Sequence, residues 1–328
     1  MTTYAIVSVG ALLAGWALDL KFGDPERMPH PVVGFGRLIG WGERRLNKGS
    51  WRRLKGGTMS LGLTIIAYLA TWIIMDLLGK LSPIIYFISG TYIVFTGLAG
   101  TTLVQEVRDV FRALDKSLDE GRRQVARIVG RDTDNLSAEE VRRAALETLA
   151  ENLSDGVVTP LFWFLLLGFP GIMAYKMVNT LDSMIGYRTS RFRRFGFIAA
   201  KTDDIANLIP SRLTATLIIL SAAILSLADG KGIRNGRHPV RMARQTLANG
   251  SKHLSPNSGW PEAALASALD CRFGGPHTYF GEMVEKPYIG DTERQTDYGD
   301  MRASIAISRL SEVVIVITVS LLRPMLFL

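Results

Sequence analysis

The sequence has little cysteine and histidine, the residues on which disulfides and many metal sites depend. Cys271 is the only cysteine, so neither an intramolecular disulfide nor a cysteine-based zinc site can form. The four histidines are scattered and lack metal-ligand spacing. The chain also lacks a GxxxxGK[ST] phosphate loop and a GxGxxG fingerprint. If the protein uses ATP, it therefore does so through a less familiar kind of site.

The composition combines high hydrophobicity with many charges. Hydrophobic residues make up 48% of the chain and charged residues 21%, with a mean hydropathy of +0.18. Such a mixture indicates apolar spans separated by hydrophilic segments. The net charge is +8, and the basic residues lie mainly in those hydrophilic segments. Retention of positive loops in the cytoplasm explains this charge better than nucleic-acid binding. We expect the partner surface to be a lipid bilayer and not a nucleic acid.

Six apolar segments approach the length of about 20 residues that a helix needs to cross a bilayer. They are Thr3–Leu18, Met59–Leu78, Pro83–Leu103, Val158–Val178, Leu208–Leu227 and Val313–Leu328. No Lys or Arg precedes the first segment, and Asp19 and Asp24 follow where a cleavage site would be expected. We therefore expect a retained first span and not a removed signal peptide.

The fourth apolar segment differs from the others because Gly168-Phe169-Pro170-Gly171 interrupts it. Glycine and proline favour a break there, so the segment is a candidate re-entrant element made of two half-helices. Four hydrophilic segments remain, at 19–58, 105–156, 179–207 and 228–312. The sequence predicts an all-α, polytopic helical membrane protein, a single integral membrane domain of five to six apolar segments with helical hydrophilic loops.

The sidedness of the loops stays open at this point. The first, second and fourth hydrophilic segments are basic and favour the cytoplasm, and segment 179–207 is basic as well. Placing every basic segment inside conflicts with a full crossing at each of the fourth and fifth apolar segments. We expect a multi-pass protein of the inner cell membrane with its active site on the cytoplasmic side.

Two groups of acidic residues lie beside the predicted spans. Glu147, Glu151 and Asp155 are four residues apart and would share one helix face. Asp203 and Asp204 precede the fifth apolar segment. A solvated acidic face explains such residues equally well. Their position at the membrane entry favours function, because carboxylates there are costly without partners. These five carboxylates are the candidate Mg²⁺ ligands.

Two predicted helix starts lie in the hydrophilic segments. Ser137 is a suitable N-cap, with Glu139 and Glu140 in the first turn. The string Ser258-Gly259-Trp260-Pro261-Glu262 begins a second helix, which Gly274-Gly275-Pro276 is expected to end. The aromatic, glycine-rich stretch that follows is typical of either a ligand-binding loop or a lid at the membrane surface.

Six strings resemble the adenosylcobinamide-phosphate synthase family of cobalamin biosynthesis. They follow one another between residues 19 and 290: GDPERMPHPVVGFGRLI, ENLSDGVVTPLFW, YKMVNTLDSMIGYR, AKTDDIANLIPSRLTA, SPNSGWPEAALA and GGPHTYFGEMVEKPYIG. The resemblance implies a membrane enzyme that joins adenosylcobyric acid to aminopropanol phosphate, or a related amino alcohol, with ATP and Mg²⁺. It also implies corrinoid and amino-alcohol phosphate as substrates, with other membrane-associated cobalamin-assembly enzymes as candidate partners.

The implied chemistry assigns hypothetical roles to charged and aromatic residues. Amide formation needs a metal on the phosphates, cationic donors and a base for the ammonium proton. The candidate catalytic residues are Glu262, Glu282, Lys286 and Lys201. The candidate substrate- and phosphate-binding residues are His30, Asn152, Asn179, Asp182, Arg188, Arg212, Asn257, Trp260, Tyr279 and Phe280. The three aromatic residues are candidates for stacking on the corrin ring, whereas the arginines could equally be charges that flank membrane spans.

Two other function classes remain open. A regulatory or sensory membrane protein, which the family's divergent branch resembles, would not need the dense pairing of acidic and basic residues. A small-molecule transporter should show inverted repeats or paired broken helices, and the sequence shows one clear break.

Overall fold

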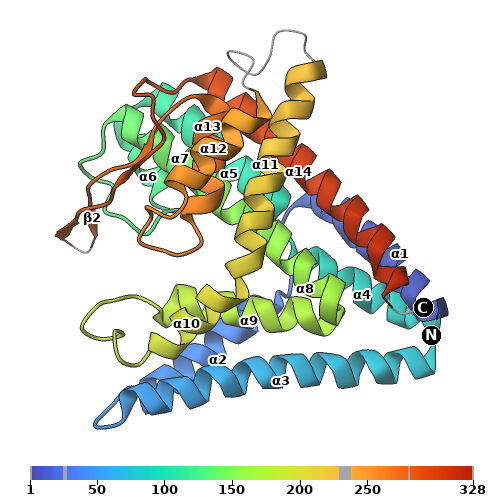
Figure 1. The fold of residues 1–328 in the computed structure, drawn as a ribbon. Helices are drawn as coiled ribbons and strands as arrows, with labels where there is room; N and C mark the ends of the chain where they lie inside the picture. Colours follow the sequence, from blue (N-terminus) through green and yellow to red (C-terminus); the bar gives the residue numbers. More distant parts are fainter. Residues whose placement is uncertain (1, 25–27, 229–237, 280, 327–328) are drawn as a thin grey trace. The chain divides into compact units, whose positions relative to one another are not determined.

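The computed structural model describes residues 2–24, 28–228, 238–279 and 281–326 (Figure 1). Over these residues it is predominantly helical, as predicted, with four short strands. The helices are α1 (Thr2–Phe22), α2 (Pro31–Leu46), α3 (Arg52–Leu81), α4 (Pro83–Gly97), α5 (Gly100–Lys116), α6 (Leu118–Val125), α7 (Ala138–Leu153), the π-helix η1 (Ser154–Val158), α8 (Thr159–Leu167), α9 (Phe169–Ile185), α10 (Phe197–Ala206), α11 (Leu208–Ala228), α12 (Pro239–Asn249), α13 (Gly259–Leu269) and α14 (Tyr298–Met325).

The chain divides into two compact units. Unit 1 comprises Met1–Ala99, Asp155–Asn207 and Val316–Leu328, and unit 2 comprises Gly100–Ser154 and Leu208–Ile315. Each unit is built from segments that are distant in sequence, so each brings together residues from different hydrophilic segments.

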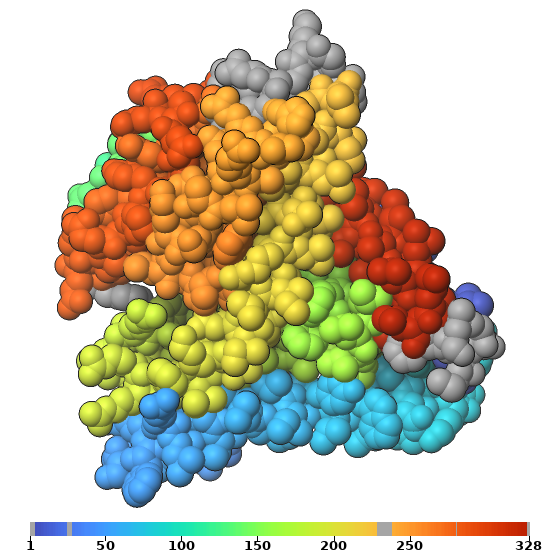
Figure 2. Space-filling view, viewed as in Figure 1, coloured from blue at the N-terminus to red at the C-terminus, as the bar shows by residue number. Residues whose placement is uncertain are grey.

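Five helical segments are long and apolar enough to cross a membrane. Within the described residues these are Tyr4–Phe22, Arg52–Leu81, Pro83–Lys116, Leu208–Leu227 and Tyr298–Met325. They overlap five of the six predicted spans. The longest uninterrupted helix among them, α3, runs along the outside of unit 1 with one long side uncovered (Figures 1 and 2). Isoleucine and leucine side chains are exposed along it, among them Ile65, Ile66 and Leu77, as expected of a helix that faces lipid.

The fourth predicted span is broken as its sequence indicated. Gly168 adopts a positive φ of 71° and separates α8 from α9. Neither half is among the five candidate spans. The structure has a second break that the apolar pattern of Pro83–Leu103 does not indicate: α4 ends at Gly97 and α5 begins at Gly100. Leu98 is fully buried in an extended conformation at this break.

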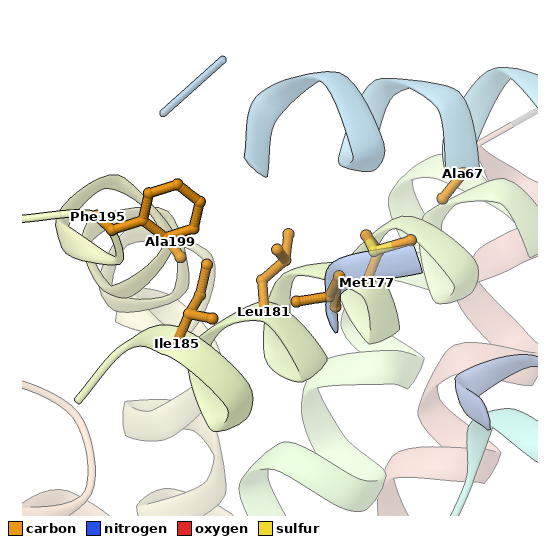
Figure 3. Packing of buried hydrophobic residues seen from close by; sticks show 7 residues of the cluster. Ala67, Met177, Leu181, Ile185, Phe195 and Ala199 are labelled. Atoms are coloured by element: carbon orange, nitrogen blue, oxygen red, sulfur yellow. The ribbon is translucent and has the colours of Figure 1, made fainter. Parts of the chain in front are cut away.

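The core of unit 1 joins α2, α3, α9 and α10. Ile39, Ala67, Met177, Leu181, Ile185, Phe195 and Ala199 form a buried apolar cluster (Figure 3). Beside this cluster the backbone of α3 lies close to the backbone at Phe195. A Cβ added at Gly56 of α3 would lie 1.9 Å from the Phe195 carbonyl oxygen. The hydrophilic segments 19–58 and 179–207 are therefore packed against each other.

Unit 2 contains the helix starts that the sequence predicted. Ser137 and Glu140 form a capping box at the start of α7. α13 begins at Gly259, but it ends at Leu269 and not at the predicted Gly274-Gly275-Pro276. Asp270 ends it with a left-handed backbone conformation, φ 60°. Gly274 instead ends the short strand β1 (Phe273–Gly274), and Gly275-Pro276 links it to β2 (His277–Tyr279). β1 pairs with β4 (Tyr288–Ile289), and β2 pairs with β3 (Glu282–Val284), both antiparallel.

Candidate functional site

A cavity of about 220 Å³ in unit 2 gathers several of the charged residues that the sequence indicated. Glu147 and Glu151 of α7 line it one helical turn apart, and Glu262 enters from α13. The other lining residues are Ile128, Val129, Gly130, Arg131, Thr148, His253, Gly274, Tyr279 and Lys286. We call this the unit 2 cavity. Its lining residues come from two hydrophilic segments, 105–156 and 228–312.

A buried ion pair between Arg131 and Glu147 forms part of its wall. The two side chains are 9% and 5% exposed. The other Glu147 oxygen, Oε1, accepts the backbone N–H of Gly274 at 2.7 Å. Burial acts to raise the pKa of the Glu147 carboxyl, but Arg131 and this N–H outweigh it and leave the pKa lowered. Nη1 of Arg131 has no hydrogen-bond partner in the part of the chain that the structure describes.

Glu262 is the second buried carboxyl of the cavity. Burial raises the pKa of Glu262 well above its usual range, and the carboxylates of Glu147 and Glu151 raise it further. Its Oε1 lies 4.0 Å from Nε2 of His253. Burial also lowers the pKa of His253, as does the charge of Lys286. The cavity thus favours a protonated carboxyl beside a neutral imidazole.

The hydrogen bonds of His253 fix its tautomer. Nδ1 accepts the backbone N–H of Ser255 at 2.9 Å. In a neutral imidazole one nitrogen accepts and the other carries the proton. The proton therefore lies on Nε2, on the side of Glu262.

The remaining charges of the cavity are Glu151 and Lys286. Glu151 Oε1 accepts the hydroxyl of Ser258 at 2.8 Å. The Lys286 ammonium lies 4.7 Å from the centre of the Tyr279 ring and donates to its hydroxyl oxygen at 2.5 Å. The cavity therefore contains two basic side chains and three carboxyl groups within one small volume.

Arg212 has a structural role that the sequence did not indicate. Its Nη1 donates to the Asn257 side-chain oxygen at 3.0 Å, and its Nη2 donates to the Pro256 carbonyl at 3.2 Å. Its guanidinium also lies 4.7 Å from the centre of the Trp260 ring. Arg212 and Asn257 thereby hold the turn before α13, and neither they nor Trp260 line the unit 2 cavity. Their phosphate, substrate and corrin roles stay predictions.

A second polar group lies in unit 1. Asn207 Oδ1 accepts the Thr159 hydroxyl at 2.9 Å and the Tyr175 hydroxyl at 3.1 Å, while its Nδ2 donates to Asp203 at 3.0 Å. Asn179 donates to Asp155 at 3.5 Å. We call the residues Asp155, Thr159, Tyr175, Asp203 and Asn207 the unit 1 polar network. Two predicted metal ligands belong to it.

The expected common face of Glu147, Glu151 and Asp155 ends at Glu151. α7 stops at Leu153, and Asp155 lies in the π-helix η1, whose i→i+5 hydrogen bonds change the register. The five predicted metal ligands are thus divided: Glu147 and Glu151 belong to unit 2, and Asp155, Asp203 and Asp204 to unit 1.

Other predicted site residues lie outside both groups. Lys201 is half-exposed and pairs with Asp204 at 2.7 Å. Arg188 and Glu282 are exposed, whereas Asp182 and Asn152 are partly buried. His30 caps α2 by accepting the Val32 N–H at 3.3 Å. Phe280 lies outside the described residues. The functional roles of these residues stay predictions.

Candidate metal ligands can be judged by which oxygens are already engaged. No group of three or more His, Cys, Asp or Glu in the described ranges is arranged for a metal. Mg²⁺ needs fewer, because it commonly binds one or two carboxylates together with waters and phosphates. Glu147 suits this role poorly, since both of its oxygens serve Arg131 and Gly274. Asp155 accepts from Asn179 and Asp203 accepts from Asn207, and the metal role of both stays a prediction.

Sequence reasoning missed Arg131 and His253. Arg131 lies in the loop after α6, among other basic residues that resemble ordinary flanking charge. His253 is isolated in sequence, without metal-ligand spacing. The one available signal was the short basic stretch before Ser137, but its contact with Glu147 depends on tertiary structure.

Comparisons with known proteins agree with the resemblance. A family model described as "CobD/Cbib protein" matches residues 12–308. The chain is 40% identical to a cobalamin biosynthesis protein CobD of Klebsiella pneumoniae, over 90% of this chain and 92% of that protein. It is 37% identical to a CobD of Photorhabdus laumondii, over 98% and 99%, and 37% identical to a cobalamin biosynthesis protein CbiB of Salmonella typhimurium, over 92% and 93%. No solved structure matches. The chain belongs to the CobD/CbiB family.

Proposed function

We propose that this membrane protein catalyses an ATP-dependent amide-forming step of cobalamin biosynthesis, joining adenosylcobyric acid to aminopropanol phosphate or a related amino alcohol. Membership of the CobD/CbiB family supports the pathway. The observation that carries the reaction type is the Glu262 carboxyl, buried beside Arg131 and Lys286 with a raised pKa. A carboxyl whose pKa is raised by burial is suited to exchange a proton with a bound ammonium.

The reaction can be written in two balanced steps. A carboxylate oxygen of the corrinoid attacks the γ-phosphorus of ATP, and ADP leaves, which gives an acyl phosphate. The amine nitrogen then attacks the acyl carbon, the C–O bond to phosphate breaks, and inorganic phosphate leaves. Glu262, once deprotonated, accepts the proton that the ammonium must lose. A bound ammonium favours this ionisation, because its positive charge stabilises the Glu262 carboxylate.

Mg²⁺, when bound with ATP, neutralises charge on the phosphates. Among the predicted ligands we assign the metal to Asp155 and Asp203 of the unit 1 polar network. Asn207 orients Asp203 through its amide, and Asn179 donates to Asp155. Glu151 and Asp204 are the alternative ligands; Glu151 accepts the Ser258 hydroxyl, and Asp204 pairs with the Lys201 ammonium.

The multi-pass character of the chain and its basic hydrophilic segments support the inner membrane, with the active site on the cytoplasmic side. ATP is available on that side. Other membrane-associated cobalamin-assembly enzymes are natural partners, since the substrate and the product are both large corrinoids.

The test is a condensation assay with purified protein in detergent. Adenosylcobyric acid, aminopropanol phosphate, ATP and Mg²⁺ are incubated with the protein, and the corrinoid is analysed by mass spectrometry. A mass gain of one condensed arm is expected only when all four components are present. Unchanged corrinoid in the complete mixture, with protein that remains folded, would refute the activity.

A further inference from the structure

We propose that the unit 2 cavity binds the phosphorylated amine, with the phosphate at Arg131 and Lys286 and the ammonium at Glu151. This assignment rests on the proposed function, because it names which substrate of that reaction the cavity receives. It excludes the corrin ring and the nucleotide from the same space.

The size of the cavity favours a small ligand. Its volume is about 220 Å³, whereas pockets for drug-sized ligands span about 300–1,000 Å³. A short amino-alcohol phosphate, with two or three carbons between its amine and its phosphate, is a ligand of that smaller size. A corrin macrocycle or a nucleoside triphosphate is several times larger.

The charges of the cavity match a zwitterion. Arg131 and Lys286 supply guanidinium and ammonium donors, which are the usual protein partners of phosphate oxygens. Glu151 supplies a carboxylate for the substrate ammonium. A ligand with charge of a single sign would complement only one of these sets, whereas a phosphorylated amine complements both.

Arg131 provides an independent observation that points to an anion. Its side chain is 9% exposed, and Nη1 has no hydrogen-bond partner among the described residues. A buried donor without a partner costs free energy. Glu147 occupies the other end of the guanidinium and holds the group in place. A phosphate oxygen that enters the cavity can supply the missing acceptor.

The experiment measures binding in the absence of ATP, Mg²⁺ and corrinoid. Isothermal titration of the full chain in detergent uses O-phosphoethanolamine as the zwitterionic probe, with ethanolamine, inorganic phosphate and ATP as comparison ligands. We expect O-phosphoethanolamine to bind more tightly than either fragment and more tightly than ATP. Binding no tighter than inorganic phosphate would overturn the proposal, as would Arg131-dependent binding of ATP alone.

Variants separate the site from a general charge effect. Arg131→Gln combined with Glu147→Gln removes both charges of the pair, so no carboxylate is left buried alone. We expect this double variant to weaken O-phosphoethanolamine binding about 10- to 100-fold, the range for hydrogen bonds to charged groups. Arg127→Gln is the matched control, because Arg127 is 60% exposed, pairs with Glu106 and does not line the cavity. Equal affinity in the double variant and the control would overturn the proposal.

A third variant tests the ammonium end. Glu151→Gln should remove the preference for O-phosphoethanolamine over inorganic phosphate while leaving phosphate binding nearly unchanged. Retention of the full preference would contradict the assignment. These results are distinguishable from failure of the proposed function. Arg131-dependent binding without condensation would support the binding site and refute the ligase activity. Condensation without Arg131-dependent binding would support the ligase activity and refute the binding site.

Discussion

Glu262 shows how a single residue acquires its chemistry from its surroundings. The carboxyl is buried in α13 and lies near two other carboxylates, and Arg131 and Lys286 compensate only part of that cost. Its raised pKa means that the folded protein binds a proton that the unfolded chain releases at a lower pH. This difference makes folding stability depend on pH.

The sign of that dependence gives a first prediction. The contribution of Glu262 protonation to the free energy of unfolding is fully present below the unfolded-state pKa of about 4.3. It is lost progressively as the pH rises towards the folded-state pKa of Glu262. The total loss is about 1.4 kcal/mol for each pH unit between the two pKa values. Glu262→Gln removes this loss. We expect the thermal midpoint of the variant, relative to wild type, to be higher at pH 8 than at pH 5. Glu282→Gln, at an exposed position, serves as the control. A Glu262→Gln difference that does not vary with pH would contradict the prediction.

Two adjacent carboxylates in α10 give a second prediction. Asp203 belongs to the unit 1 polar network, whereas Asp204 pairs with half-exposed Lys201. In the condensation assay we expect Asp203→Asn to lose at least about 100-fold in rate, as is common when an electrostatic group of an active site is removed. Asp204→Asn should lose less. The rate at rising Mg²⁺ concentration is the measurement, and full activity in Asp203→Asn would exclude its metal role.

The sequence indicates several residues of the unit 2 cavity but not Arg131. Glu147, Glu151, Glu262, Tyr279 and Lys286 were all singled out, and the structure places them around one space. Helix periodicity explains the first pair, because residues four apart share a face. Arg131 could not be found in this way, since its partner depends on how distant segments pack.

At the level of elements, local signals predicted some breaks and missed others. Gly168 with Pro170 marked the end of α8, because glycine tolerates the positive φ that the turn requires. The break between α4 and α5 at Leu98 has no proline and follows an apolar run, so local pattern suggested one span. The π-helix η1 likewise has no simple sequence signal. Packing, and not local preference, determines both.

Two glycines of α3 give a third prediction. Gly56→Ala would place a Cβ 1.9 Å from the Phe195 carbonyl oxygen, whereas nothing lies within 4 Å of a Cβ added at Gly62. Alanine is favoured over glycine in a helix by about 1 kcal/mol. We expect Gly62→Ala to leave the thermal midpoint in detergent unchanged or to raise it, and Gly56→Ala to lower it by several degrees. Equal midpoints for the two variants would show that the close contact with the Phe195 backbone is absent.

At the level of the whole molecule, contacts within each unit restrict the membrane topology. In unit 1, Arg191 pairs with Glu43 at 2.8 Å, so segments 19–58 and 179–207 lie on one side of the membrane. In unit 2, Gly274 and Ser258 donate to Glu147 and Glu151, so segments 105–156 and 228–312 also share a side. An even number of crossings must therefore separate each pair. The second pair requires that α8–α9 and α11 either both cross the bilayer or both return to the side that they entered. If α3 and Pro83–Lys116 both cross, the first pair requires α8–α9 to return, and α11 then returns as well.

Site-directed labelling checks this topology as a fourth prediction. Cys271 is buried, so the wild-type protein should react little with the maleimide. Labelling in a Cys271→Ala variant then comes only from the introduced cysteines. Lys48→Cys and Arg188→Cys should react with an impermeant maleimide from the same side of the membrane. Asp119→Cys and Glu282→Cys should likewise agree with each other. Labelling of either pair from opposite sides would contradict the contacts within that unit.

The central claim, that ATP activates a corrinoid carboxylate for attack by an amine, is tested most directly by following oxygen. Adenosylcobyric acid carrying ¹⁸O at both oxygens of its reactive carboxylate is condensed by the wild-type protein, and the inorganic phosphate is analysed by mass spectrometry. We predict one ¹⁸O atom in the phosphate for each amide formed, because the carboxylate oxygen leaves with the phosphoryl group. Amide formation with unlabelled phosphate, or without consumption of ATP, would contradict the account.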